Sequence, residues 1–286
     1  MTARGDDSRP AQGSGEGAIE AVLLDIDGTL LDSNDAHAQA WSDALREAGH
    51  EIGSETVLPL IGMGSDKLLP KLTGIDAESE EGKRLVERSK AIFAKEYLPL
   101  VKPFPQAREL LERMRDDGVK LVVATSAAED ELRGLLAALG AEWLVDEKTS
   151  SSDADRSKPD PDIIRAALDR GGLGAGEAIM LGDTPYDVEA AAKAGVGPAA
   201  CVMLGDTPYD VEAATRSRVR IVAVRCGGHG DEELRGAVEI YDDPAAILSR
   251  YEESVIGRGI RQSRGRPASG RGRERREAGP ESGQRP

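Results

Sequence analysis

Aromatic side chains and cysteines are scarce in this chain. Phe, Trp and Tyr together make up 3% of the 286 residues, so aliphatic side chains and alanine must fill the core. The two cysteines, Cys201 and Cys226, have neither the spacing of metal ligands nor the surroundings of a nucleophile. We predict that both are reduced structural thiols.

Long apolar runs are missing as well. The sequence holds no stretch of about 18 apolar residues that could span a membrane. Residues 1–17 lack the apolar segment of a secretory signal. We therefore expect a cytoplasmic protein without a membrane partner, and a disordered leader over residues 1–17.

Positively charged residues are scarce relative to acidic ones in most of the chain but not at its end. The formal net charge is −15, yet residues 257–286 hold nine Arg against three Glu, a balance of +6 that leaves −21 for the rest. An acidic body argues against a nucleic-acid surface on the folded part. Residues 252–286 are too poor in apolar side chains to fold, so they are predicted to form a disordered Arg/Gly-rich tail. This tail could still tether the protein to a nucleic acid or to lipid.

The stretch from Ala21 to Leu30 is the one around which the chain is organised. Its apolar half predicts a strand buried on both faces that leads into Asp25 and Asp27. The carboxyl ends of parallel strands are where open α/β sheets bind ligands. A carboxylate there can attack phosphorus, and a second one two residues later lies on the same side and can transfer protons. The same residues also fit a core strand that ends in an Asp-Gly turn.

The pattern Asp25-Ile26-Asp27-Gly28-Thr29-Leu30 resembles the first motif of the haloacid dehalogenase superfamily of phosphohydrolases. The second motif matches at Thr125 and Ser126, where a hydroxyl and backbone N–H groups follow the predicted strand 119–124 and precede a helix. A threonine at such a turn is also an ordinary helix cap.

Two more motifs follow in the order of the family. Lys158 precedes Pro159 in a loop before a helix, where a fixed ammonium can neutralise phosphoryl oxygens. The strand 178–181 then ends in Gly-Asp, with Asp183 followed by Asp187 four residues later. Carboxylate oxygens of this kind are the ligands that Mg²⁺ prefers.

The resemblance implies a role for each matching residue. Asp25 would be the nucleophile and Asp27 the acid and then the base. The implied phosphate ligands are Thr125, Ser126 and Lys158, and the implied Mg²⁺ ligands are Asp25, Asp27 (through its carbonyl), Asp183 and Asp187, the last of which would ligate or orient.

Helical patterns with no strand signal fill the segment between the first two motifs. We predict an all-helical cap over residues 33–101, inserted into an α/β core of residues 18–32 and 102–251, and acting as a lid. Within it, His37 is placed like a histidine of the phosphoglycolate phosphatase and β-phosphoglucomutase branch, and Lys67 follows a Gly-rich loop. Both are candidate substrate contacts, and both also fit exposed helix positions.

The fourth motif occurs twice. Met203–Ala213 repeats Met180–Ala190 letter for letter, 23 residues later. We expect the first copy at the metal site, because parallel strands lie about 4.8 Å apart and the second copy would end about 10 Å from the strand of Asp25. In the alternative arrangement the first copy loops out, and the metal ligands are Asp206 and Asp210.

With both copies in the sheet, six strands would take the order 3-2-1-4-5-6, the third being Glu142–Val145. The expected fold is thus an α/β, Rossmann-like parallel-sheet core with an inserted all-helical cap domain. The expected function is a Mg²⁺-dependent phosphatase that hydrolyses a small phosphorylated metabolite through an aspartyl-phosphate. Two alternatives stay open: β-phosphoglucomutase-like phosphoryl transfer, and a non-catalytic phosphate-binding module disabled by the duplication.

Overall fold

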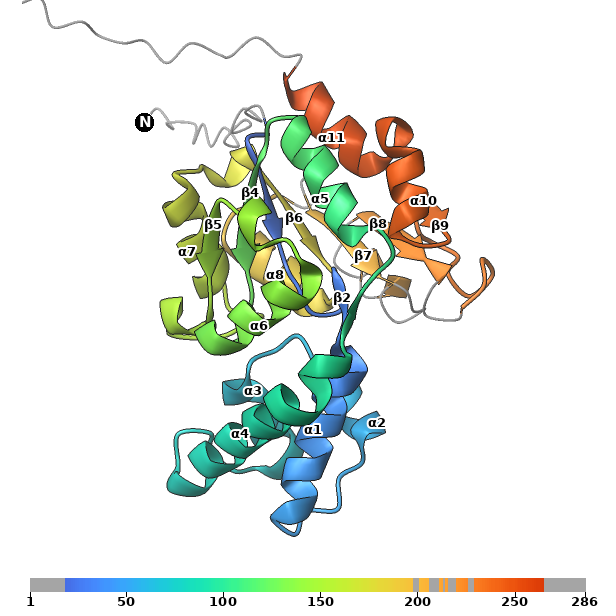
Figure 1. Cartoon of the computed structure of the whole chain (residues 1–286). Helices are drawn as coiled ribbons and strands as arrows, with labels where there is room; N and C mark the ends of the chain where they lie inside the picture. Colours follow the sequence, from blue (N-terminus) through green and yellow to red (C-terminus); the bar gives the residue numbers. More distant parts are fainter. Residues whose placement is uncertain are drawn as a thin grey trace, which may run out of the picture.

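The computed structural model describes residues 19–197, 201–205, 211–212, 214–215, 220–225 and 229–264. A parallel sheet with helices on both faces forms the upper body in Figure 1, and a group of helices forms the cap beneath it. The expected fold class is confirmed. None of the helices in these described ranges is long and apolar enough to cross a membrane. The cytoplasmic location stays a prediction.

In the described part of the chain, seven parallel strands form the main sheet, in the order β5-β4-β1-β6-β7-β8-β9. The first six reproduce the predicted order 3-2-1-4-5-6, and β9 is an edge strand that the sequence did not predict. Both copies of the repeated motif contribute a strand, and the first copy's strand β6 pairs with β1. The strands are β1 (Ala21–Leu24), β4 (Lys120–Ala124), β5 (Glu147–Thr149), β6 (Ala178–Gly182), β7 (Cys201–Gly205), β8 (Arg220–Val224) and β9 (Glu239–Tyr241).

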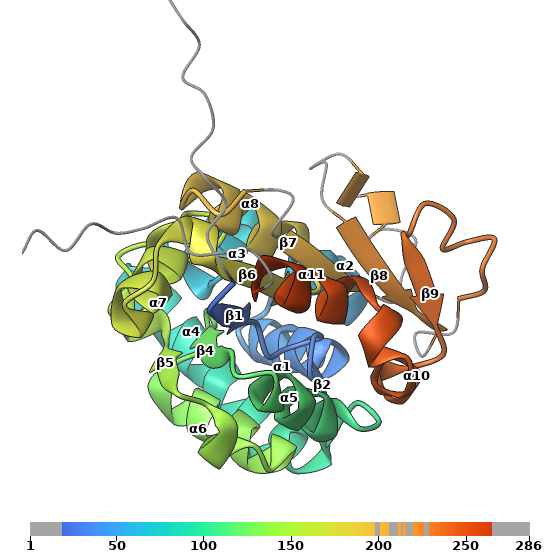
Figure 2. The same cartoon turned by 90° about the horizontal axis from the view of Figure 1, so that it is seen from above.

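Helices cover both faces of this sheet, as the view from above shows (Figure 2). One face packs against α5, α6, α10 and α11, and the other against α7 and α8. Their bounds are α5 (Ala107–Asp116), α6 (Glu129–Leu139), α7 (Asp162–Gly171), α8 (Pro185–Lys193), α10 (Pro244–Ser249) and α11 (Val255–Arg264).

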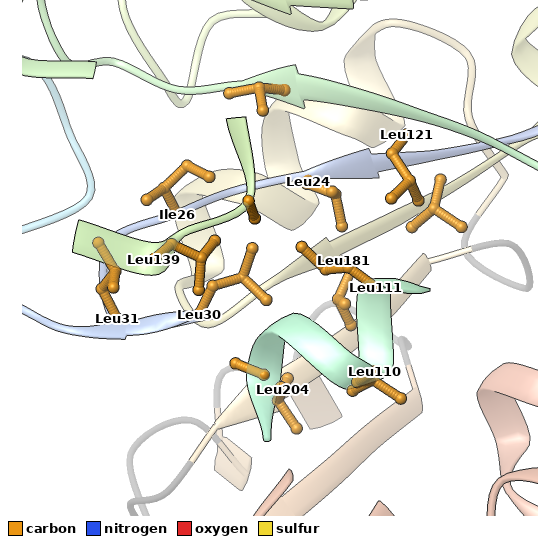
Figure 3. Packing of buried hydrophobic residues seen from close by; sticks show 14 of the residues in the cluster. Leu24, Ile26, Leu30, Leu31, Leu110, Leu111, Leu121, Leu139, Leu181 and Leu204 are labelled. Carbon is orange, nitrogen blue, oxygen red and sulfur yellow. The ribbon is translucent and has the colours of Figure 1, made fainter. Parts of the chain in front are cut away.

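Strand β1 has apolar side chains on both faces, which accounts for its central position. Val22 and Leu24 belong to the cluster on the α5 side, whereas Ala21 and Leu23 belong to the cluster on the α7 side. Figure 3 shows Leu24 packed among leucines from several elements, among them Leu111 of α5. Full burial of one such side chain contributes about 1.5 to 3 kcal/mol, so the sheet needs few aromatic residues.

The cap has its own apolar core, which includes Trp41, Leu45, Leu69 and Leu85. Two short antiparallel strands, β2 (Leu31–Asp32) and β3 (Lys102–Pro103), carry the chain into the cap and back. The cap helices are α1 (Asn34–Glu47), α2 (Ser54–Val57), α3 (Ser65–Thr73), α4 (Glu80–Ile92) and the π-helical turn Phe93–Tyr97.

Two predicted boundaries are wrong. Residues 142–144 form a 3₁₀ turn with Trp143 66% exposed, and the third strand is instead β5, an edge strand with only one fully buried side chain. The predicted tail begins too early, because α11 buries Val255, Ile256 and Ile260 against the core. The leader 1–17 and the tail beyond residue 264 lie outside the described residues.

Candidate active site

The carboxyl ends of β1 and β6 bring two motifs together. The two strands pair in register, Leu24 opposite Leu181, and the backbone N–H of Asp25 donates to the carbonyl of Leu181 at 2.9 Å. The next residues along each strand end are therefore neighbours. The side chains of Asp25 and Asp183 are both buried there, although each carries an ionisable carboxyl group.

Three buried carboxylates and one buried ammonium lie together at the carboxyl ends of β1 and β6. Oxygens of Asp25, Asp183 and Asp187 lie within 4.8 Å of one another. Lys158, which is 1% exposed, donates from Nζ to Asp25 Oδ1 at 2.5 Å and to Asp187 Oδ1 at 2.6 Å. With all four groups ionised the cluster carries a charge of −2. An all-oxygen donor set of this charge fits a hard divalent cation.

Burial and neighbouring charge perturb the protonation of this cluster. Burial, reinforced by the charge of Asp187, raises the pKa of Asp25 to about 7, although Lys158 opposes the shift. Burial alone would lower the pKa of Lys158, but Asp187 and Asp25 outweigh it and hold that pKa above its ordinary value. Lys158 is therefore a permanent cation between two acids.

Residues of the first motif and of α1 orient Asp183. Thr29 Oγ1 donates to Asp183 Oδ1 at 3.2 Å, and Asn34 Nδ2 donates to Asp183 Oδ2 at 2.8 Å. Gly28 adopts a φ of 73°, and a Cβ there would collide with the Asp183 carboxylate, so this turn requires glycine. The sequence indicated no role for Thr29 or Asn34, although the position of Asn34 at the start of a helix beside the first motif was an available signal.

Asp187 is held by the turn that opens α8. Thr184 donates to Asp187 Oδ2 from its backbone N–H at 3.1 Å and from its hydroxyl at 2.6 Å. This leaves the other oxygen to Lys158. The geometry supports an orienting role for Asp187, and its carboxylate still lies among the possible ligands.

Asp27 has a separate set of partners on the cap side. Ser33 Oγ donates to Asp27 Oδ1 at 2.6 Å, and His37 Nε2 lies 2.9 Å from the same oxygen. The His37 ring stacks on Phe93 at 3.8 Å, and Glu131 Oε1 lies 3.7 Å from Nε2. Glu131 could not be singled out from the sequence, because it lies in the first turn of α6 without a motif of its own.

Burial and pairing act in opposite directions on these two groups. Burial raises the pKa of Asp27, but the charge and hydrogen bond of His37 outweigh it, so the pKa lies below its ordinary value. Burial likewise lowers the pKa of His37, but Asp27 outweighs it and the net pKa is raised. The pairing thus favours the ionised form of both groups.

The second motif supplies polar groups at the end of β4. Thr125 is buried, and its Oγ1 accepts a hydrogen bond from the backbone N–H of Ala127 at 3.1 Å, which leaves the hydroxyl proton available. The Oγ of Ser126 is buried with no hydrogen-bond partner within the described part of the chain. Both residues line the same cavity as Asp25 and Asp27.

This cavity lies between the core and the cap and has a volume of about 140 Å³. A cavity of about 150 Å³ accommodates a molecule as small as benzene, so the space suits a small ligand. His37 lines it, whereas Lys67 and the predicted phosphate ligand Lys158 are not part of the lining formed by the described residues. Lys67 instead pairs with Asp160 at 2.8 Å. The other cap residues that line it include Trp41, Met63, Ser65, Lys90 and Phe93.

Two further sets of residues were singled out in the sequence: the second copy of the fourth motif and the two cysteines. Asp206 and Asp210 of the second copy, and Cys226, lie outside the described residues. Cys201 is a free, buried thiol in β7, and burial raises its pKa to about 12. It is unreactive at neutral pH, because the thiolate is the reactive form.

Comparison with known proteins places the fold and the motifs in one family. Residues 22–201 match the family model described as haloacid dehalogenase-like hydrolase, which is more than half of the chain. The chain belongs to this family. The expected superfamily is confirmed, and so is the expectation of a phosphatase-type hydrolase at the level of the family and its named relatives.

Two curated relatives cover most of their own length in the match. A phosphoglycolate phosphatase of Nitrosospira multiformis is 32% identical over 182 residues, 62% of this chain and 80% of the relative. The pyrophosphatase PpaX of Bacillus velezensis is 30% identical over 177 residues, with the same shares of 62% and 80%.

Solved structures show the same architecture. A hydrolase from Pseudomonas syringae superposes with a TM-score of 0.62 at 26% identity, over 82% of this chain and 98% of that one. A putative β-phosphoglucomutase from Bacteroides vulgatus superposes with a TM-score of 0.61 at 22% identity, over 86% and 91%, and shows the fold alone.

Proposed function

We propose that this protein is a Mg²⁺-dependent phosphatase that hydrolyses a small phosphomonoester through an aspartyl-phosphate on Asp25. The observation that carries the proposal is the buried cluster of Asp25, Asp183 and Asp187 around Lys158, in which Asp25 lines the cavity between the core and the cap. The named phosphatase relatives support the reaction class.

The first step forms a bond between a carboxylate oxygen of Asp25 and phosphorus and breaks the bond to the leaving oxygen. The proton for that oxygen comes from His37 and passes to it through Asp27. In the second step water attacks the aspartyl-phosphate, Asp27 takes the proton from the water, and inorganic phosphate leaves with Asp25 restored. His37 and Ser33 hold Asp27 in place through both steps.

The phosphoryl group would be held by the second motif and by Lys158. The unpartnered Ser126 hydroxyl and the free proton of Thr125 face the cavity and can donate to phosphoryl oxygens. The ammonium of Lys158 stabilises negative charge that develops on Asp25 and the phosphoryl group. Asp25, Asp183 and Asp187 would hold Mg²⁺, which neutralises phosphoryl charge when bound.

The test uses hydrolysis of an aryl phosphate in Mg²⁺, measured as released inorganic phosphate. Asp25→Asn and Asp183→Asn are expected to abolish turnover, and Asp206→Asn, at the equivalent position of the repeated motif, is the matched control expected to retain it. Loss of turnover in Asp206→Asn alone would assign the second copy to the site. Phosphate binding without turnover in the wild type would favour the non-catalytic module, and transfer to a sugar hydroxyl in place of water would favour the mutase.

A further inference from the structure

The loop that carries Lys158 touches the cap on both sides of that residue. Ser157 immediately precedes Lys158, and Asp160 follows two residues later. Both are bound by residues at the start of cap helix α3, namely Asp66 and Lys67. The loop is therefore held at two points that flank the catalytic ammonium in sequence.

The contact before Lys158 is a set of hydrogen bonds to Ser157. Its hydroxyl donates to Asp66 Oδ1, and its backbone N–H donates to Asp66 Oδ2 at 3.4 Å. The backbone N–H of Gly64 donates to Ser157 Oγ at 3.1 Å, and a Cβ at Gly64 would collide with the Ser157 side chain. This close approach requires glycine at position 64.

The contact after Lys158 is an ion pair. Lys67 Nζ lies 2.8 Å from Asp160 Oδ2 and also donates to the carbonyl of Ser157. The two charged side chains are 27% and 22% exposed, so solvent screens this pair less than it screens the exposed ion pairs of the surface. Lys67 thus spans both contacts, although the sequence predicted it to bind substrate.

The position of this loop matters because Lys158 acts at hydrogen-bonding distance. Its ammonium contacts Asp25 and Asp187 at 2.5 and 2.6 Å, and a displacement of about 1 Å at a catalytic group can cost about 100-fold in rate. The cap residues that contact the Lys158 loop belong to or adjoin the segment 61–66, which also lines the cavity. A cap that moves away from the core would release the loop.

We propose that Asp66 and Lys67 are positioning residues that fix the loop carrying Lys158 only while the cap is closed over the cavity. The proposal rests on the proposed function for the role of Lys158. It couples enclosure of the substrate to completion of the charge around the nucleophile, so that phosphoryl transfer starts only when bulk water is shut out.

Charge reversal tests the ion pair directly. Lys67→Asp and Asp160→Lys are each expected to lower kcat for an aryl phosphate by about 10- to 100-fold with a smaller change in KM, because the ammonium of Lys158 is misplaced rather than substrate binding lost. The double variant is expected to recover most of the activity, since it restores an ion pair of opposite polarity. Lys71→Asp, at an exposed position of the same helix, is the matched control.

Hydrogen exchange of the backbone supplies a readout that does not depend on turnover. Amides of residues 156–160 are expected to exchange faster in each single variant and to return toward the wild-type rate in the double variant. A loss confined to KM, with no rescue by the second charge, would make Lys67 a substrate contact and overturn the proposal. Unchanged exchange in the single variants would overturn it as well. A wild type that hydrolyses nothing would refute the proposed function, and the exchange experiment would then decide the cap contact by itself.

Discussion

His37 and Asp27 form a partly buried pair in which Nε2 lies 2.9 Å from Oδ1. The pair joins the first helix of the cap to the first motif of the core. Because the pKa of Asp27 is lowered and that of His37 is raised, folding favours the ionised form of both groups.

The stability of the protein should therefore depend on this pair within a defined pH window. A lowered carboxyl pKa stabilises the fold above the unfolded value of 3.8, and a raised histidine pKa does so below the unfolded value of 6.5. His37→Gln is expected to cost about 1.5 to 3 kcal/mol near pH 5.5 and clearly less near pH 9. Urea unfolding of the metal-free protein at the two pH values measures this, with His50→Gln as control. An equal loss at both pH values would refute it.

Lys158→Met should damage both activity and stability. It leaves two buried carboxylates facing each other, and removal of one partner from a buried ion pair costs about 3 to 5 kcal/mol. The turnover of an aryl phosphate should fall by about 100- to 1000-fold, the loss typical of a removed charge-stabilising donor. Unfolding curves and kcat check the two effects. Lys95→Met, whose side chain is 82% exposed in the wild type, is the control. A stable, inactive variant would separate the two roles.

Mg²⁺ should stabilise the folded protein through its carboxylates. At about 100 times the dissociation constant a ligand adds about 2.7 kcal/mol, seen as a higher Tm. Asp183→Asn should lose this shift and Asp206→Asn should keep it. The pKa of Asp25 is raised to about 7 in the absence of metal, so below that pH a proton must leave before the cation binds. The Mg²⁺-dependent shift should therefore shrink from pH 8 to about pH 6; a constant shift would exclude Asp25 as a ligand.

Ile260→Ala tests the packing of the C-terminal helix. Ile260 is completely buried in α11, and such truncations cost about 2 to 5 kcal/mol. Val238→Ala, at a site that is 51% exposed, should change the free energy of unfolding by no more than about 0.5 kcal/mol. Calorimetry of both variants decides the point. Equal stabilities would mean that α11 is not docked in solution.

The first, second and fourth motifs could be recognised from the sequence because each follows a strand whose side chains are all or nearly all buried. A continuous apolar run that ends in Asp or Thr marks both the strand and its carboxyl end, so Asp25, Thr125 and Asp183 could be placed at one edge of a sheet. The order predicted for a sheet that holds both copies of the repeated motif agrees with the observed one, but the runs left open the arrangement in which the first copy loops out.

Edge elements gave weaker signals. Strand β5 has one fully buried side chain and β9 has three residues in all, so their backbone pairing with a neighbour, rather than their composition, determines them. The helix α11 follows the same rule. Its Val255, Ile256 and Ile260 are too few to indicate a helix among Arg and Gly, and burial against the core stabilises it.

The sequence by itself determined the chemistry of this protein, because the type of residue at each strand end limits what that end can do. Only the tertiary structure decided the partners of those residues. In the folded protein, Lys67 contacts the loop of Lys158. His37 and Ser33 contact Asp27. Asn34 donates to Asp183, which lies 149 residues away in the sequence. Such contacts depend on how the cap packs on the core, and the spacing of residues along a single chain does not encode that packing in a readable pattern.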